Sequence, residues 1–168
     1  MMHAFSKYVP EGVQLRRIVQ IGVVVADLDK VTASLTALFG IAPFRVVTWP
    51  DRAEARYWYR GEEEVIKIKQ AFVQLGGVEV ELIQPLEGKN AYKDFLDEKG
   101  GGIHHMLFEV SDIEPVLKEM EKAGIAVLQS GTGIRPGTRW ALLDTQAQVG
   151  FLVELRHRPG DSDGLSIS

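Results

Sequence analysis

The segment IHHMLFEVSDIEPV (103–116) decides the fold, because IVQIGVVVADLDKV (18–31) repeats its pattern near the N-terminus. In each copy a hydrophobic run typical of a β-strand leads to an aspartate, and the aspartate opens a stretch with helical spacing. The two copies align Gln20 with His105, Val25 with Val110, Asp27 with Asp112, and Val31 with Val116. An internal repeat of this kind predicts two structural units built in the same way.

The last predicted strand of each unit also repeats in sequence. VEVEL (78–82) corresponds to FLVEL (151–155), which sets Glu81 on Glu154. Strand-like runs fill the chain at 16–25, 44–49, 55–61, 65–75, 78–85, 102–110, 125–130, 139–145 and 151–158. The Gly76–Gly77 pair predicts a hairpin, and 90–100 predicts a short helix between the halves. The sequence therefore predicts an α+β fold of two βαβββ modules, at about 17–86 and 102–157, with one shared sheet surface.

Composition limits what the chain can do. It has 168 residues, 45% of them hydrophobic, which is enough for a core within one domain at 17–157. It has no cysteine, so disulfides, thiol nucleophiles and cysteine metal ligands are excluded. A net charge of −4 without a Lys/Arg run argues against nucleic acid, and the longest apolar run (21–26) is too short to cross a membrane.

The two ends of the chain are expected to lie outside the domain. Residues 1–16, which contain Pro10 and Gly12, are expected to form an N-terminal arm. Residues 158–168 are rich in Pro, Gly and Ser and are expected to form a flexible tail. The N-terminus lacks the apolar core of a signal peptide, so the cytoplasm is the expected compartment.

Strand alternation selects four polar residues as a candidate site. Side chains along a strand point alternately to opposite faces, so the hydrophobic positions of four strands pack on one face. The residues that interrupt the other face are Gln20, Glu81, His105 and Glu154, which are two pairs of repeat-equivalent positions. One imidazole, two carboxylates and an amide oxygen form an open mixed set that suits divalent Zn, Ni, Co, Mn or Fe.

Each of these residues alone has a simpler explanation. A single glutamate in a strand usually faces solvent, and Gln20 by itself carries almost no information. Adjacent histidines such as His104 and His105 are mostly incidental, and alternation points only one of them to the site. Their joint placement by a repeat found from other residues favours the site, with His105 facing it and His104 on the other face.

The quoted segments, together with LGGVEVELIQPLEG (75–88) and GFLVELRH (150–157), resemble the vicinal oxygen chelate superfamily over about residues 17–157. This superfamily includes glyoxalase I, methylmalonyl-CoA epimerases, bleomycin-resistance proteins and extradiol dioxygenases. The resemblance implies a glyoxalase-like fold, in which paired βαβββ modules form a curved mixed sheet, a cup around a divalent metal. It places the metal ligands at Gln20, Glu81, His105 and Glu154.

Within the superfamily the chain is most similar to methylmalonyl-CoA epimerases, through FLDEKGGGIHHMLFEV (95–110). Those epimerases usually have histidine as the first ligand, where this chain has Gln20. The Gln/Glu/His/Glu set resembles that of some glyoxalases I, but Val24 and Pro85 replace the Arg and Asn that hold glutathione there. The resemblance to dioxygenases and fosfomycin enzymes is weaker, because these use two histidines and a glutamate.

The resemblance implies a metal-dependent epimerase or isomerase that removes a proton next to the carbonyl of an acyl-CoA-type thioester. Glu154 is then one acid–base group, and Glu64, which shares a strand face with Phe72, is the second candidate. The alternatives are a glyoxalase I-like lyase and a non-catalytic small-molecule binding protein. A homodimer is expected, as in many family members. Candidates for substrate contact are Tyr57, Tyr59, Gln70 and Arg139.

Overall fold

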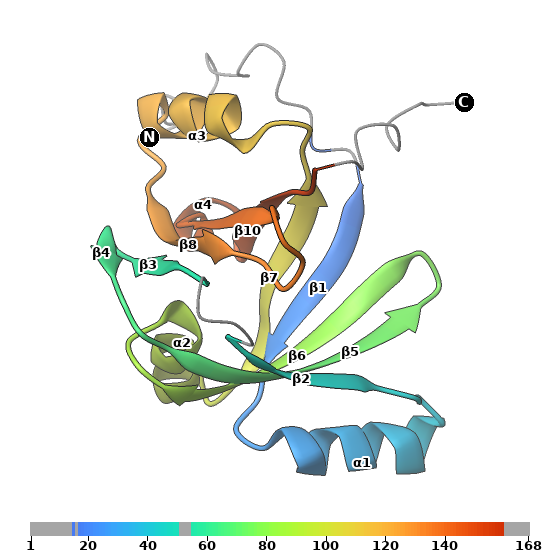
Figure 1. Ribbon diagram of the computed structural model, residues 1–168. Coiled ribbons are helices and arrows are strands. Elements are labelled where there is room, and N and C mark those ends of the chain that lie inside the picture. Colours follow the sequence, from blue (N-terminus) through green and yellow to red (C-terminus); the bar gives the residue numbers. More distant parts are fainter. Residues whose placement is uncertain (1–14, 16, 51–54, 160–168) are drawn as a thin grey trace.

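Ten strands form one mixed sheet that curls into a half-barrel (Figure 1). The computed structural model describes residues 15, 17–50 and 55–159 of the chain. The expected N-terminal arm and C-terminal tail lie outside the described residues, except for Leu15, Arg158 and Pro159. The curled sheet confirms the predicted α+β glyoxalase-like fold.

Each half of the chain supplies four neighbouring strands. The strand order is β2-β5-β6-β1-β7-β10-β9-β8-β3-β4. The first half provides β1 (Ile18–Val24), α1 (Leu28–Phe39), β2 (Arg45–Trp49), β3 (Tyr57–Tyr59), β4 (Glu62–Glu63), β5 (Lys67–Leu75) and β6 (Val78–Glu87). Then follow α2 (Ala91–Lys99), β7 (Gly102–Glu109), α3 (Ile113–Lys122), β8 (Val127–Thr132), β9 (Arg139–Leu143), α4 (Gln146–Val149) and β10 (Leu152–His157).

The two halves meet through the antiparallel pair β1 and β7. Ile21 pairs with Met106, and these two residues occupy equivalent positions of the sequence repeat. On the outer sides β6 runs parallel to β1 and β10 runs parallel to β7. An approximate twofold axis therefore passes between Ile21 and Met106, and the closing strands of the two modules flank the central pair in the same way.

The helices α1 and α3 cover the convex face of the sheet at opposite ends of the view (Figure 1). The repeated aspartates begin them: the Asp27 carboxylate accepts a bond from the Lys30 N–H (2.9 Å), and Asp112 accepts one from the Glu114 N–H (3.1 Å). One core cluster packs α1 against β1, β5 and β6, and another packs α3 against β7, β9 and β10. The hydrophobic strand positions thus face the helices, which leaves the concave face for polar residues.

An aromatic cluster lines part of the concave face, and of its three residues the sequence had indicated only Tyr57. Trp49, Tyr57 and Trp140 pack together, with ring centroids 6.0 Å apart for Trp49–Tyr57 and for Tyr57–Trp140. Tyr57 belongs to β3, which pairs with β8 of the other half rather than with its own module. The predicted strand at 55–61 therefore exists in part, but it links the two modules across the open side of the sheet.

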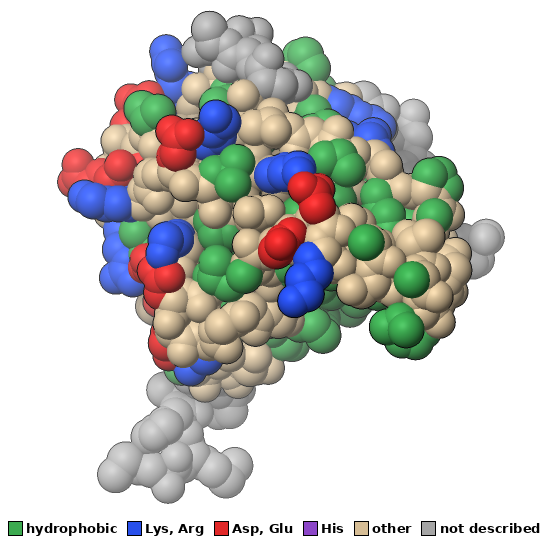
Figure 2. Space-filling model, turned by 90° about the horizontal axis from the view of Figure 1, so that it is seen from below, with side chains coloured by type: hydrophobic (Ala, Val, Ile, Leu, Met, Phe, Trp, Pro, Cys, Tyr) green, Lys and Arg blue, Asp and Glu red, His purple; other side chains and the backbone are tan. Residues whose placement is uncertain are grey.

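The side of the molecule that carries α1 mixes hydrophobic patches with charged side chains (Figure 2). Two apolar residues at the end of α1, Leu38 and Phe39, are 72% and 71% exposed. The expected homodimer stays a prediction, since these exposed residues do not identify a partner. Within the described residues no helix is both long and apolar enough to span a bilayer.

Candidate metal centre and substrate cavity

The four predicted ligand residues lie on the four central strands and are all buried. Gln20 is on β1, Glu81 on β6, His105 on β7 and Glu154 on β10. His105 Nε2 is 3.1 Å from Glu154 Oε2 and 3.7 Å from Glu81 Oε2. The structure thus brings Glu81, His105 and Glu154 into contact on the floor of the cup, and Gln20 lines the same cavity beside Glu79.

Gly22 makes room for the His105 imidazole. It pairs with His105 across β1 and β7 and with Glu81 across β1 and β6. A Cβ atom at this position would lie 2.0 Å from His105 Cε1, far inside contact distance. A glycine in the middle of a hydrophobic strand is a sequence signal for such close approach, and it could have identified Gly22 as part of the site.

A β-bulge corrects the expected orientation of His104. Gly22 pairs with His105 while the next residue, Val23, pairs with Ile103, so His104 is the extra residue on β7. The Nδ1 atoms of His104 and His105 are only 3.1 Å apart, which is incompatible with opposite faces of a regular strand. The prediction that alternation separates the two rings was therefore wrong, because it assumed an unbroken pleat.

His104 packs beneath α2 and has no direct access to the cavity. Its ring contacts Tyr92 and Phe95, with centroid separations of 5.2 and 4.9 Å. Burial, together with the neighbouring His105, lowers the pKa of His104 well below its usual value. His104 is therefore a neutral packing residue that supports the strand carrying His105.

Two side-chain amides hold two glutamates on the cup floor. Gln20 Nε2 donates to Glu79 Oε1 at 2.6 Å, and Gln70 Nε2 donates to Glu81. With their amide nitrogens so engaged, both amides keep a carbonyl oxygen for other contacts. Glu79 was missed as a site residue, although it shares its strand face with Glu81 and alternation could have included it.

The cluster buries two carboxylates beside one imidazole. Burial raises the pKa of Glu154 to about 7, with the His105 ring opposing and the Glu81 carboxylate adding to the shift. Burial alone would lower the pKa of His105, but Glu154 and Glu81 outweigh it, and the pKa is raised. A buried acid pair served by one imidazole favours binding of a cation.

A divalent ion fits the chemistry of this cluster. His105 Nε2 is completely buried, has no aligned hydrogen bond and faces two carboxylates. A cation would accept this nitrogen as a ligand and neutralise Glu81 and Glu154, with the Gln20 carbonyl as a fourth donor. Among the described residues, no three His, Asp or Glu side chains already have their donor atoms in coordination positions. The metal assignment of Gln20, Glu81, His105 and Glu154 therefore stays a proposal.

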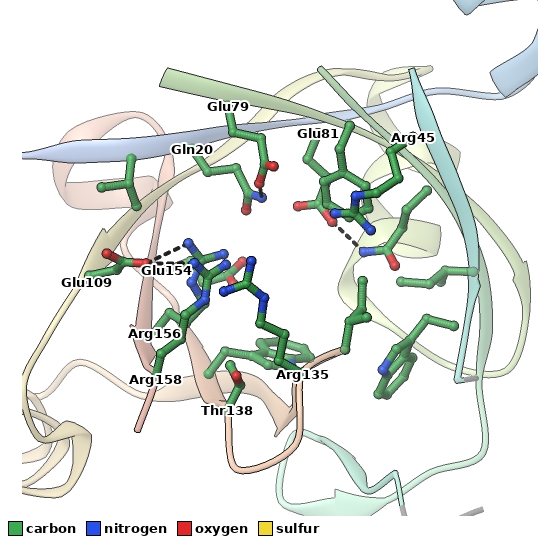
Figure 3. A pocket seen from close by; sticks show the side chains of 18 of the residues that line it. Gln20, Arg45, Glu79, Glu81, Glu109, Arg135, Thr138, Glu154, Arg156 and Arg158 are labelled. Atoms are coloured by element: carbon green, nitrogen blue, oxygen red, sulfur yellow. Dashed lines mark hydrogen bonds and ion pairs between the residues drawn. The ribbon is translucent and has the colours of Figure 1, made fainter. Parts of the chain in front are cut away.

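A cavity of about 650 Å³ opens above the cluster (Figure 3). Of the predicted contact residues, Tyr57 and Gln70 line it. Tyr59 instead bonds to Asp94, and Arg139 pairs with Glu114 on α3. The other lining residues include Arg45, Glu79, Glu109, Arg135, Thr138, Trp140, Arg156 and Arg158.

Glu64, the second predicted acid–base group, does not line this cavity. It lies before β5 begins, and its carboxylate is 3.7 Å from Lys89 Nζ. The even-spaced residues that follow it, Ile66, Ile68 and Gln70, do line the cavity. Even spacing placed Glu64 with them only on the assumption that β5 extended that far, whereas the strand starts at Lys67.

A curled sheet built from two βαβββ modules around a polar cavity is the glyoxalase-like fold. The chain matches the family model described as Glyoxalase/Bleomycin resistance protein/Dioxygenase superfamily over residues 19–141. It belongs to this superfamily, which confirms the resemblance inferred from the repeat and the strand motifs.

Several curated proteins with similar sequences are methylmalonyl-CoA epimerases. The mitochondrial methylmalonyl-CoA epimerase of Mus musculus is 28% identical over 144 residues, covering 84% of this chain and 73% of the relative. The uncharacterised protein YqjC of Bacillus subtilis is 30% identical over 99 residues, covering 56% of this chain and 69% of the relative. A solved Streptomyces coelicolor methylmalonyl-CoA epimerase variant in complex with 2-nitronate-propionyl-CoA superimposes with a TM-score of 0.65 at 23% identity, covering 87% and 99% of the two chains.

Proposed function

We propose that this protein is a metal-dependent epimerase that moves a proton on the carbon next to the carbonyl of an acyl-CoA-type thioester. The observation that carries the proposal is the buried cluster of Glu154, His105, Glu81 and Gln20 on the floor of an open cavity. The similarity to curated methylmalonyl-CoA epimerases supports the same reaction class. The substrate is therefore a small molecule, and methylmalonyl-CoA is the first compound to test.

Gln20, Glu81, His105 and Glu154 would hold the metal. When bound, a divalent cation supplies positive charge that polarises the thioester carbonyl and favours the enolate. Gly22 keeps space for the His105 ring, and the amides of Gln20 and Gln70 orient Glu79 and Glu81. The protein thereby fixes the donor atoms before the substrate enters.

Glu154 is suited to accept the proton from carbon. Its carboxyl lines the cavity beside His105 Nε2, 3.1 Å away, so it can meet a substrate carbon held over the floor. Breaking the C–H bond leaves its electron pair in the enolate and the proton on Glu154. Returning a proton to the opposite face of the same carbon completes the inversion.

A second carboxyl must donate on that opposite face. Glu64 does not line the cavity, so its position does not support the role first expected for it. Glu79 lines the cavity and its carboxylate is bonded to Gln20, so we assign the second acid–base role to Glu79. Glu64→Gln serves as the comparison, because it makes the same chemical change at the carboxylate first expected to hold this role, which lies next to Tyr57 at the edge of the cavity.

Two other functions remain as alternatives from the same fold. A glyoxalase I-like lyase would use the same four donors, but Val24 is fully buried and Pro85 lies within β6, and neither offers a polar group to glutathione. A non-catalytic binding protein would need no acid–base group, so the buried carboxylates favour an enzyme over a binder.

The decisive experiment is proton exchange in deuterated water. We expect incorporation of deuterium at the α-carbon of methylmalonyl-CoA with added Co²⁺, Ni²⁺, Mn²⁺ or Zn²⁺, and its loss in Glu154→Gln. Glu79→Gln should slow inversion more than Glu64→Gln, which should resemble the unmodified protein. Absence of exchange with every metal, together with turnover of the methylglyoxal–glutathione hemithioacetal, would replace the epimerase by the lyase.

A further inference from the structure

The cavity is lined by charges of both signs. The carboxylates of Glu79, Glu81 and Glu154 line it together with several arginines, among them Arg45, Arg135 and Arg156 (Figure 3). Arg45 comes from β2, at one edge of the sheet, and Arg135 comes from the hairpin between β8 and β9, near the other edge. The two guanidinium groups therefore approach the cavity from opposite walls of the cup.

These two arginines are not neutralised within the described part of the chain. Arg45 lies over the Phe72 ring, 4.2 Å from its centroid, and has no ion pair there. Arg135 likewise has no carboxylate partner there, although the nearby Arg156 uses Glu109, at 2.8 Å. Both side chains are exposed at the cavity, and a guanidinium without a carboxylate partner offers its fork of N–H donors to an anion.

Two further donors on the Arg135 side lack acceptors. Thr138 lines the cavity, is only 4% exposed, and its buried hydroxyl has no hydrogen-bond partner. Arg156 also lines the cavity, and its buried Nε is unpaired even though its Nη2 bonds to Glu109. Buried donors without acceptors are costly, so a ligand that supplies acceptor oxygens is the expected complement.

The hairpin holds Arg135 and Thr138 in place. The Thr138 N–H donates to the Arg135 carbonyl (3.1 Å), and the Gly133 N–H donates to the Thr138 carbonyl (2.9 Å). Gly137 adopts φ of 78°, a left-handed conformation that favours glycine, within this turn. The donors are therefore presented by a fixed backbone rather than by a loop that must reorganise.

We infer that Arg135, Thr138 and Arg156, with Arg45 on the facing wall, form an anion-binding subsite that holds an oxyanion of the substrate while its reactive carbon lies over the floor. This inference rests on the proposed function for the identity of the substrate. A carboxylate on the acyl group and a phosphate of the CoA portion share the required chemistry, because each offers several acceptor oxygens to a guanidinium fork.

The test is calorimetric binding of methylmalonyl-CoA, propionyl-CoA and CoA to the metal-loaded protein. Arg135→Ala should weaken methylmalonyl-CoA binding by about ten- to a hundredfold, the range expected for losing charged hydrogen bonds. Arg135→Lys should restore part of the affinity, and Thr138→Val should weaken it less. Arg139→Ala is the matched control, since Arg139 follows in the same hairpin but pairs with Glu114 outside the cavity.

The three ligands distinguish the sources of the anion. A loss confined to methylmalonyl-CoA assigns the subsite to the acyl carboxylate, and an equal loss for all three ligands assigns it to CoA phosphates. Affinities in Arg135→Ala that match those of Arg139→Ala for every ligand would overturn the inference. Because binding is measured apart from turnover, lack of deuterium exchange in the unmodified protein would count against the epimerase and leave the subsite standing.

Discussion

At the scale of single residues, the site depends on Gly22 having no side chain. Gly22 has no Cβ, and the His105 ring occupies the space where that atom would be, 2.0 Å from Cε1. His105 in turn lies against Glu154 and Glu81. The position of the only imidazole among the proposed ligands is therefore set by a residue on the neighbouring strand.

Gly22→Ala tests this dependence. The added methyl group should displace the imidazole, lower the free energy of unfolding by about 1–3 kcal/mol as overpacked sites do, and weaken metal binding at least about tenfold. Titration calorimetry with Ni²⁺ and thermal unfolding would measure both effects. Gly77→Ala is the control, because a Cβ there meets nothing within 4 Å. Equal metal affinity in the two variants would show that the ring position does not matter.

At the scale of elements, the repeat places the same cap before each of the two outer helices. Asp27 begins α1 and Asp112 begins α3, and each carboxylate accepts a backbone N–H of the first turn. These caps lie at the convex face, on the far side of the sheet from the cluster on the floor. They should support the modules without influencing the metal directly.

Asp27→Ala and Asp112→Ala should each lower the free energy of unfolding by about 1 kcal/mol, the usual effect of losing an N-cap. Urea unfolding would measure the change, and Asp27→Asn and Asp112→Asn, which keep a capping oxygen, should restore most of it. Metal affinity should stay within about twofold of the unmodified protein, because a domain that loses about 1 kcal/mol of stability stays almost fully folded and the caps lie away from the donors. A large drop in metal affinity would mean that the helices position the donors.

At the scale of the whole molecule, the cluster ties the two modules together. Gln20 and Glu81 belong to the first half, while His105 and Glu154 belong to the second. The modules already share the β1–β7 pairing and the β3–β8 pairing. A metal bound by both halves would add a third connection, made only in the folded state.

Metal should therefore stabilise the whole fold. At a hundredfold excess over Kd, binding to the native state adds about 2.7 kcal/mol, which corresponds to a rise in Tm of about 5–10 °C for a chain of this size. Thermal unfolding with Ni²⁺ and then with excess EDTA would measure the rise and its reversal. Glu81→Gln and Glu154→Gln should reduce the shift, whereas Glu64→Gln should keep it. An unchanged Tm in the unmodified protein would argue against a metal held by both modules.

Much of this molecule could be read from its sequence. The repeat and the period of two along each strand predicted the paired modules and the Gly76–Gly77 hairpin with Phe72 opposite Glu81. They also singled out Glu81, His105 and Glu154, which are in contact on the floor. These features follow from local geometry, because alternation in a strand and equivalence in a repeat depend only on spacing along the chain.

The tertiary structure alone decided the features that depend on contacts between distant segments. The bulge that turns His104 under α2, the start of β5 that leaves Glu64 outside the cavity, and the crossing of β3 to β8 all break a local period. Arg156 pairs with Glu109, whereas Arg135 has no such partner among the residues that the structure describes, and this difference arises where strands remote in sequence face one cavity. Spacing determined which residues share a face, and only the packing of the folded chain determined which of them touch.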